Sequence, residues 1–478
     1  MISLSWEELF YEGSLPNKRL RLRAIAIGEA MTERPGVAMT RAYDDKQGTR
    51  NAYNFFENKR MSLETLLDPP TRALALKLSE LPEGTTVLNV QDTSEINLSH
   101  LKKMKGLGAI GNPNNRGIFM HPALAVDTTG VPLGLMDLQT WKRPIETSGK
   151  AETRRDRAFD DKESLRWWTA IDQTEHKVGR PGLLLHVGDR ESDIYELFSR
   201  CDVASYRLLV RAAQDRRVEG EHRLLWAQME SLPACTEQRT IDVAPRPATK
   251  DKPAQPARTA TVAVRFGEVT LRAPHNGQGS VRMWAILARE VDAPLQVEPL
   301  EWLLLTLDPI TTETEAWERV TWYGYRWVIE EFFKVLKSGC RIQARQFETV
   351  EHFEVSLGLS MLTAVKLLQM TKRARIDPAQ PAISTLSADE EDVLIRHAEV
   401  HRGRPPNPLR LGEAVLLIAA LGGYKGRSCD GPPGWSTLWH GYQRLCAMVD
   451  GFQLRPASPV DLRRAERAES SGAGYGTI

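Results

Sequence analysis

Short runs of apolar and β-branched residues begin at about residue 85. The runs at 85–92, 117–126 and 131–138 have the composition of strands, and a turn signal at 127–130 separates the last two. They predict three successive strands of an antiparallel meander.

Further along, the runs at 183–188 and 206–211 also predict strands. Between the meander and these runs, apolar residues recur with helical spacing from 162 to about 178. This mixture of strands and helices is typical of the α/β class.

Both ends of the chain show helical spacing without strand signals, and Asp68-Pro69-Pro70 punctuates the first boundary. We therefore expect a helical N-terminal domain at 1–68, a core domain at 69–370 and a helical C-terminal domain at 371–478.

Residues 215–312 interrupt the α/β order with further β-like segments. These segments lie at 259–266, 268–273, 279–288 and 301–306. Residues 243–258 are rich in Pro and basic residues, so they predict a long exposed loop rather than a central strand. We expect a β-rich insertion at about 215–312.

Residues 323–337 predict a helix with two chemically distinct sides. Tyr323, Arg326, Glu330 and Lys337 share an arc of roughly 60° over about four turns of 3.6 residues. Val328, Phe332, Val335 and Leu336 lie on the opposite side, toward a core. A phenol, a guanidinium, a carboxylate and an ammonium suit a phosphodiester held beside a metal ion. The other interpretation is a solvated face with an ordinary Arg326–Glu330 pair.

Three acids are placed where strands and this helix can bring them together. Asp92 ends the first strand of the meander, Asp189 follows the strand at 183–188, and Glu330 lies on the helix. If the first and fourth strands are neighbours, Asp92 and Asp189 converge and Glu330 can face both. Three carboxylates suit Mg²⁺ or Mn²⁺. Singly, an Asp after a strand is more often a helix cap or a loop residue.

Composition excludes several classes of protein. The chain has 63 Lys+Arg against 62 Asp+Glu, a formal net charge of +1, so any electropositive surface must be local. Its five cysteines form no Cys-x-x-Cys pair, which points to a reducing compartment. No signal segment and no apolar run of 18 residues is evident, which indicates a soluble, cytoplasmic protein.

The N-terminal helices carry basic residues, among them Lys18 and Arg19, that can contact DNA phosphates. From the sequence alone, a plain solvated basic face is the better interpretation of the same pattern.

Taken together, these motifs resemble the DDE cut-and-paste transposases of the bacterial insertion-sequence-four group. The family signature Tyr-x2-Arg-x3-Glu-x6-Lys is matched by Tyr323, Arg326, Glu330 and Lys337. Gln91-Asp92-Thr93 is similar to the first acidic motif of the family and residues 188–194 to the second.

The resemblance implies an RNase H-like core, a mixed five-stranded sheet flanked by helices, that carries the β-rich insertion. It implies that Asp92, Asp189 and Glu330 are catalytic and bind two Mg²⁺ ions, which Mn²⁺ can replace.

Further roles follow from the resemblance for DNA-contacting residues. Tyr323, Arg326, Lys337 and Arg211 would hold phosphates, and Trp302 would stack on a base flipped from the DNA end. A core tryptophan in an apolar strand is the alternative for Trp302.

The resemblance also implies the partners and the reaction. The partners would be double-stranded transposon ends, target DNA and a second copy of the chain in a synaptic homodimer, with no membrane and no nucleotide cofactor. The reaction would nick the end, form and open a hairpin intermediate, and join the 3′-OH to target DNA. The protein would be a bacterial cytoplasmic protein that associates with the nucleoid when it binds DNA.

Two other functions stay open. One is a catalytically silent DNA-binding and dimerising inhibitor of transposition, and the other is an RNase H-like nuclease that cuts without strand transfer.

Overall fold

The computed structural model describes residues 4–43, 45–112, 114–144, 159–243, 245, 248, 254–274, 279–295, 297–403, 408–427, 431 and 433–453. The described residues form two compact units. The first falls within residues 1–29 and 38–369, and the second within 30–37 and 370–478. Most of the predicted N-terminal region and of the predicted core falls in the first unit, whereas residues 30–37 fall in the second. An independent 1–68 domain remains a prediction.

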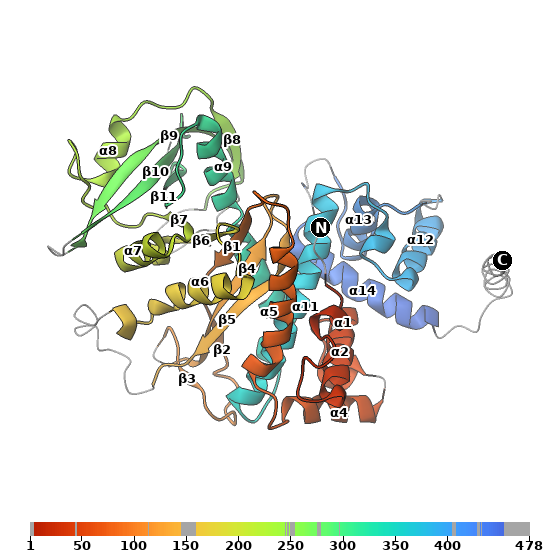
Figure 1. Ribbon diagram of the computed structural model, residues 1–478. Coiled ribbons are helices and arrows are strands. Elements are labelled where there is room, and N and C mark those ends of the chain that lie inside the picture. Colours follow the sequence, from red (N-terminus) through yellow and green to blue (C-terminus); the bar gives the residue numbers. More distant parts are fainter. Residues whose placement is uncertain are drawn as a thin grey trace, which may run out of the picture. The chain divides into compact units, whose positions relative to one another are not determined.

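A single mixed β-sheet runs through the first unit (Figure 1). Its strands are β1 (Val87–Gln91), β2 (Ser94–Asn97), β3 (Gly108–Ala109), β4 (Arg116–Val126), β5 (Pro132–Trp141), β6 (Leu184–Gly188), β7 (Arg207–Arg211), β8 (Arg239–Val243), β9 (Arg258–Arg272), β10 (Ser280–Glu290) and β11 (Glu301–Thr306). The strand order is β2-β4-β1-β6-β7-β11-β10-β9-β8, and β5 and β3 also pair with β4.

The strands β5, β4, β1, β6 and β7 form the core of this sheet. β1, β4 and β5 pair antiparallel as the predicted meander, and Asp127 Oδ1 closes the turn by accepting from the Val131 N–H at 2.9 Å. β6 pairs parallel with β1 on one side and with β7 on the other. The first and fourth predicted strands are therefore neighbours, which meets the condition for Asp92 and Asp189 to converge.

Sequence reasoning missed the short strand β2, which pairs antiparallel with the first half of β4. Gly117 of β4 makes this close approach possible, because a Cβ there would lie 1.9 Å from the Ile96 carbonyl oxygen.

The insertion does not form a separate sheet. β11 pairs antiparallel with β7, through Leu304–Arg211 and Leu305–Val210, so the core strands continue into the insertion without a break. The two segments predicted at 259–266 and 268–273 are one strand, β9, because Gly267 keeps its place opposite Ala285 of β10. Most of the predicted loop at 243–258 lies outside the described residues.

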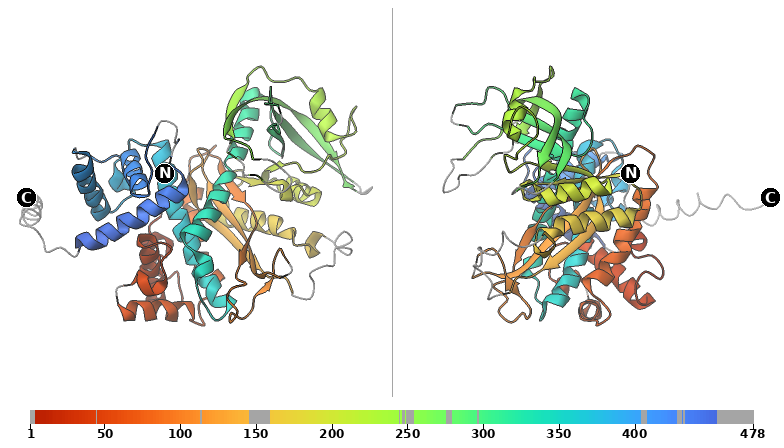
Figure 2. Two further views of the ribbon diagram at one scale, coloured as in Figure 1. Left: turned by 180° about the vertical axis from the view of Figure 1, so that it is seen from behind. Right: turned by 60° about the vertical axis from the view of Figure 1, so that its left-hand side comes forward.

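Helices cover the core strands on both faces (Figures 1 and 2). The helices that lie wholly or partly in the first unit are α1 (Trp6–Leu9), α2 (Lys18–Glu33), α3 (Met39–Ala42), α4 (Lys46–Phe56), α5 (Leu63–Ser79), α6 (Leu165–Val178), α7 (Tyr195–Ala204), α8 (Leu225–Ser231), α9 (Glu313–Gly324), α10 (Trp327–Lys334) and α11 (Val350–Ile376). Helices α5 and α6 pack against β5, while α11 crosses the opposite face. The expected break at Pro69-Pro70 was wrong, since both prolines lie inside α5 and are buried.

One apolar cluster joins the core strands to the insertion. It contains Trp167 of α6, Phe198 of α7, Val210 of β7, Leu271 of β9 and Leu305 of β11, all at most 1% exposed. Burying such side chains stabilises each by about 1.5–3 kcal/mol, so this cluster holds the insertion on the core.

The second unit is helical. It contains α12 (Ala388–Arg402), α13 (Leu411–Leu421) and α14 (Trp435–Gln453). Helix α11, which ends in this unit, is long and apolar enough to span a membrane by length and composition. However, 89% of its most apolar window is buried, and the core helix of a globular protein passes the same test. The cysteines at 201, 235, 340 and 446 are free, and Cys429 lies outside the described residues.

Candidate active site

Asp92 and Asp189 lie at the same edge of the sheet. Each follows the last residue of its strand, β1 and β6 respectively, and these strands are parallel neighbours with Val90 opposite Val187. Parallel neighbours end at one edge, which places both aspartates there. Asp92 is only 8% exposed, and Asp189 Oδ1 accepts from the Glu191 N–H at 2.8 Å.

Arg326 brings Glu330 of α10 to the same place. Its Nη1 donates to Asp92 Oδ2 at 3.0 Å and lies 3.5 Å from Glu330 Oε1. The guanidinium therefore stands between an acid of the sheet and an acid of the helix. The ordinary i,i+4 pair weighed from the sequence is present, but it is part of a larger cluster.

The charges in this cluster act on one another. Burial, together with repulsion from Asp189 and Glu330, raises the pKa of Asp92 to about 7, although Arg326 and the Thr93 N–H oppose the rise. Near neutral pH, the groups of the chain therefore do not fully compensate the negative charge of Asp92. A further cation at this place would favour the charged form of its side chain.

The backbone at 323–337 is less regular than predicted. Tyr323 is the penultimate residue of the helix α9, Arg326 lies in the turn before α10, and Lys337 lies in a π-helical turn, η5 (Val335–Gly339). The apolar side is confirmed, since Val328, Phe332, Val335 and Leu336 are at most 2% exposed. The irregular turns still keep the four polar groups on the side that faces the sheet edge.

Tyr323, Arg211 and Trp302 adjoin the cluster on the insertion side. Burial raises the pKa of Tyr323, against the opposing charges of Arg326 and Arg211. Arg211 Nη2 donates to the Glu301 carbonyl at 2.7 Å. The half-buried Trp302 ring meets the Tyr323 ring edge-on, with centroids 5.4 Å apart. Trp302 is thus neither fully exposed nor a fully buried core residue.

Lys337 lies on the other side, beside β2. Its Nζ donates to Ser94 Oγ at 2.7 Å, and burial lowers its pKa although Glu95 and Glu330 oppose this. Trp327, by contrast, is 58% exposed, with the Arg326 guanidinium 5.3 Å from its ring centroid.

Sequence reasoning missed Arg166 of α6, which ties the two acidic loops together. Its Nε donates to Thr93 Oγ1 at 2.7 Å and its Nη2 to Glu191 at 2.8 Å. Thr93 follows Asp92, and Glu191 lies two residues after Asp189. These partners are 73 and 25 residues away in the chain, so no local pattern could have revealed the contact.

The donor chemistry of Asp92, Asp189 and Glu330 fits a hard divalent cation, because all three are carboxylates and one is destabilised by the other two. As the side chains stand, no group of three acidic, His or Cys residues in the described part of the chain is drawn together tightly enough to hold a metal ion. The Arg326 guanidinium provides the positive charge between Asp92 and Glu330 instead.

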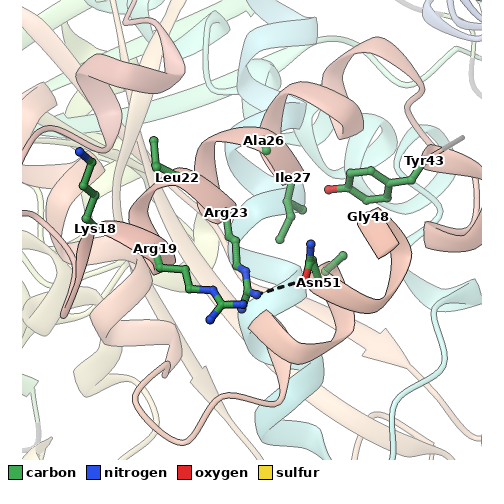
Figure 3. A pocket seen from close by; sticks show the side chains of 10 residues that line it. Lys18, Arg19, Leu22, Arg23, Ala26, Ile27, Tyr43, Gly48 and Asn51 are labelled. Carbon is green, nitrogen blue, oxygen red and sulfur yellow. Dashed lines mark hydrogen bonds between the residues drawn. The ribbon is translucent and has the colours of Figure 1, made fainter. Parts of the chain in front are cut away.

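Lys18 and Arg19 are not part of this cluster. They line a cavity of about 540 Å³ between α2 and α4, where the Arg19 and Arg23 side chains converge beside Asn51 (Figure 3). Arg23 donates to Asn51 at 3.1 Å, and burial together with the charge of Arg19 lowers its pKa. Among the described residues, no carboxylate pairs with Lys18 or Arg19. The cavity thus has an uncompensated basic rim.

The core strand order, with an antiparallel meander beside two parallel strands, is consistent with an RNase H-like domain. Residues 138–365 match the family model described as Transposase DDE domain. This match supports a DDE transposase family, an enzyme class that acts on DNA and generally uses divalent metal ions. The matched segment contains Asp189 and Glu330 but not Asp92, which the β1–β6 pairing and Arg326 bring into the cluster.

Proposed function

We propose that this chain is a metal-dependent, cut-and-paste DNA transposase of the insertion-sequence-four group, similar to the transposase of transposon five. The observation that carries the proposal is the convergence of Asp92, Asp189 and Glu330 around Arg326 at one sheet edge.

In this proposal Asp92, Asp189 and Glu330 hold two Mg²⁺ ions, or Mn²⁺ in their place. Such ions activate the attacking oxygen and stabilise the leaving oxygen in an in-line displacement at phosphorus. Arg326 moves from the carboxylates to the DNA phosphate, because both are anionic and the cations replace it between the acids.

Tyr323, Arg211 and Lys337 hold further phosphates on either side of the reacting one. Trp302 is half-buried beside Tyr323, which leaves part of its ring available to stack on a flipped base. Stacking on an aromatic ring offsets the few kcal/mol that unstacking a base costs.

The reaction runs through nicking, a hairpin intermediate, hairpin opening and strand transfer. Each step is a hydrolysis or transesterification at phosphorus, so one site serves all of them without a nucleotide cofactor. Lys18 and Arg19 contact the end DNA, as the uncompensated basic rim between α2 and α4 suggests.

We further infer that the 371–478 helices dimerise two end-bound copies in a synaptic complex and that the protein works in the bacterial cytoplasm on nucleoid DNA. The alternatives are a silent DNA-binding inhibitor and a nuclease without strand transfer.

A cleavage assay separates these functions. Purified protein is incubated with DNA that carries the inverted ends flanking its coding region, with Mg²⁺ or with EDTA, and resolved on a denaturing gel. We expect Mg²⁺-dependent nicks at the boundary, then hairpin species and strand-transfer products. Asp189→Ala should slow cleavage on the order of 10⁴-fold while it retains DNA binding.

The matched control is Asp202→Ala, an exposed aspartate at the end of α7, which should cleave normally. Binding without cleavage by the wild type would favour the inhibitor. Cleavage without joined products would favour the nuclease, and full activity of Asp189→Ala would exclude the proposed site.

A further inference from the structure

A second cavity adjoins the carboxylate cluster, on the side away from the insertion. It measures about 410 Å³, and residues of β2, β4, β5 and α6 line it. Thr93 and Ser94, which directly follow Asp92, form one wall, and Glu191 of the Asp189 loop forms part of another. The cavity therefore opens next to both acidic loops, and its volume is that of a small-molecule site.

Aromatic rings form the apolar part of this cavity. The Phe119 and Trp141 rings are nearly parallel, with centroids 5.3 Å apart and planes 13° apart. The Arg143 guanidinium lies 4.4 Å from the Phe119 centroid. Flat apolar surfaces of this kind suit a planar heteroaromatic ligand.

The polar part of the cavity is not suited to a chain of phosphates. Its lining includes two arginines, and both are already paired: Arg143 with Glu163 through two bonds of 2.6 Å, and Arg166 with Glu191 at 2.8 Å. A third glutamate, Glu95, makes the formal charge of the lining negative. Paired donors and acceptors of this kind match the edge of a neutral base rather than an anion.

We propose that this cavity takes an unpaired nucleobase of the DNA strand whose phosphate lies at the carboxylates. This inference rests on the proposed function, because it needs a nucleic-acid strand at Asp92 and Asp189. The site differs from Trp302, which contacts Tyr323 on the insertion side. Arg166 connects the cavity to the acidic loops. It lines the cavity, and it also donates to Thr93 and Glu191, which lie next to Asp92 and near Asp189.

The test measures base preference in EDTA, without cleavage. Fluorescence anisotropy gives the Kd of the full chain for labelled dT10, dC10 and dA10 and for an abasic decamer with the same phosphates. Stacking of one base stabilises a complex by about 1–3 kcal/mol, so the wild type should bind at least one base-containing decamer about tenfold more tightly than the abasic one.

Two variants change the cavity in opposite ways. Trp141→Ala removes an aromatic wall, and Ser164→Tyr fills the space from the start of α6, where the Ser164 side chain makes no capping bond. Both should reduce the base-to-abasic ratio about tenfold. The control Trp284→Ala changes a comparable partly buried strand tryptophan beneath an arginine, Arg282, and should keep the ratio.

A wild-type ratio near one, or a folded Ser164→Tyr variant with the wild-type ratio, would overturn the inference. A cavity-dependent ratio in a protein that never cleaves its ends would keep the nucleobase site and reject the transposase. Normal cleavage, together with a base-to-abasic ratio that is unchanged in both variants, would keep the transposase and reject the nucleobase site.

Discussion

Two buried aspartate–arginine pairs follow strands β6 and β1 but differ in how completely their hydrogen-bonding groups and charges are compensated. Asp193, four residues after Asp189, accepts from the Ala213 and Gln214 N–H groups at 2.7 and 2.9 Å and from Arg216 Nε at 2.7 Å. Arg216 also donates to the Asp193 carbonyl at 2.6 Å. The two side chains are 0% and 6% exposed. This pair ties the loop after β7 to the loop after β6.

The pair of Asp92 and Arg326 is built differently. Among the described residues, Asp92 accepts hydrogen bonds only from the neighbouring Thr93 N–H at 2.7 Å and from Arg326 at 3.0 Å, while Asp189 and Glu330 repel it. Asp193 finds its hydrogen-bond donors and a positive charge within the chain. Asp92 instead lies beside two further carboxylates, whose negative charge the one arginine does not balance. The first arrangement holds a loop in place, and the second prepares a place for a cation.

The largest expected effect is on the satisfied pair. Asp193→Ala leaves Arg216 buried without its carboxylate, which should lower the free energy of unfolding by about 3–5 kcal/mol. Urea denaturation measures the loss, with the exposed Asp202→Ala as the control of the same chemistry. A loss below about 1 kcal/mol would mean that the pair of Asp193 and Arg216 does not hold the two loops in place.

The opposite result is expected for Asp92→Asn. Burial and the neighbouring carboxylates raise the pKa of Asp92 in the folded protein to about 7, above its ordinary value of 3.8. Above pH 7 the side chain is charged in both states, but its charged form is less stable in the folded protein than in the unfolded chain. The variant should therefore be more stable by roughly 1–2 kcal/mol at pH 8 in EDTA. The gain should shrink as pH falls from 7 toward 4, since the wild-type carboxyl then becomes protonated. If Asp92→Asn were no more stable than the wild type at pH 8, the Asp92 charge would not be uncompensated in the folded protein.

The smallest effect is expected for the removal of the Arg326 side chain. Arg326→Ala should cost about 1 kcal/mol in EDTA, because it leaves three acids without their shared cation, and millimolar Mg²⁺ should restore that loss. The matched change Arg216→Ala should be more destabilising, and Mg²⁺ should not restore it. Thermal melts with and without Mg²⁺ measure both. Equal rescue of the two variants would remove the distinction between the pairs.

Much of the fold followed from local patterns. The meander, the strand at 183–188 and the helices around residues 20, 50 and 170 were predictable, because each depends on apolar spacing within one segment. Asp92 and Asp189 were also predictable as candidate site residues, because each directly follows a buried strand. The continuation of the sheet from β7 into β11 was not predictable, since strand pairing across 90 residues leaves no local signature.

The sequence by itself determined which groups are available: three carboxylates at strand ends and on a helix, with a phenol, a guanidinium and an ammonium at helical spacing. The tertiary structure decided their partners. It placed Arg326 between Asp92 and Glu330, Lys337 on Ser94, and Arg166 across both acidic loops. The physical reason is that residue spacing constrains direction along one element, whereas charge compensation and burial depend on which elements pack together.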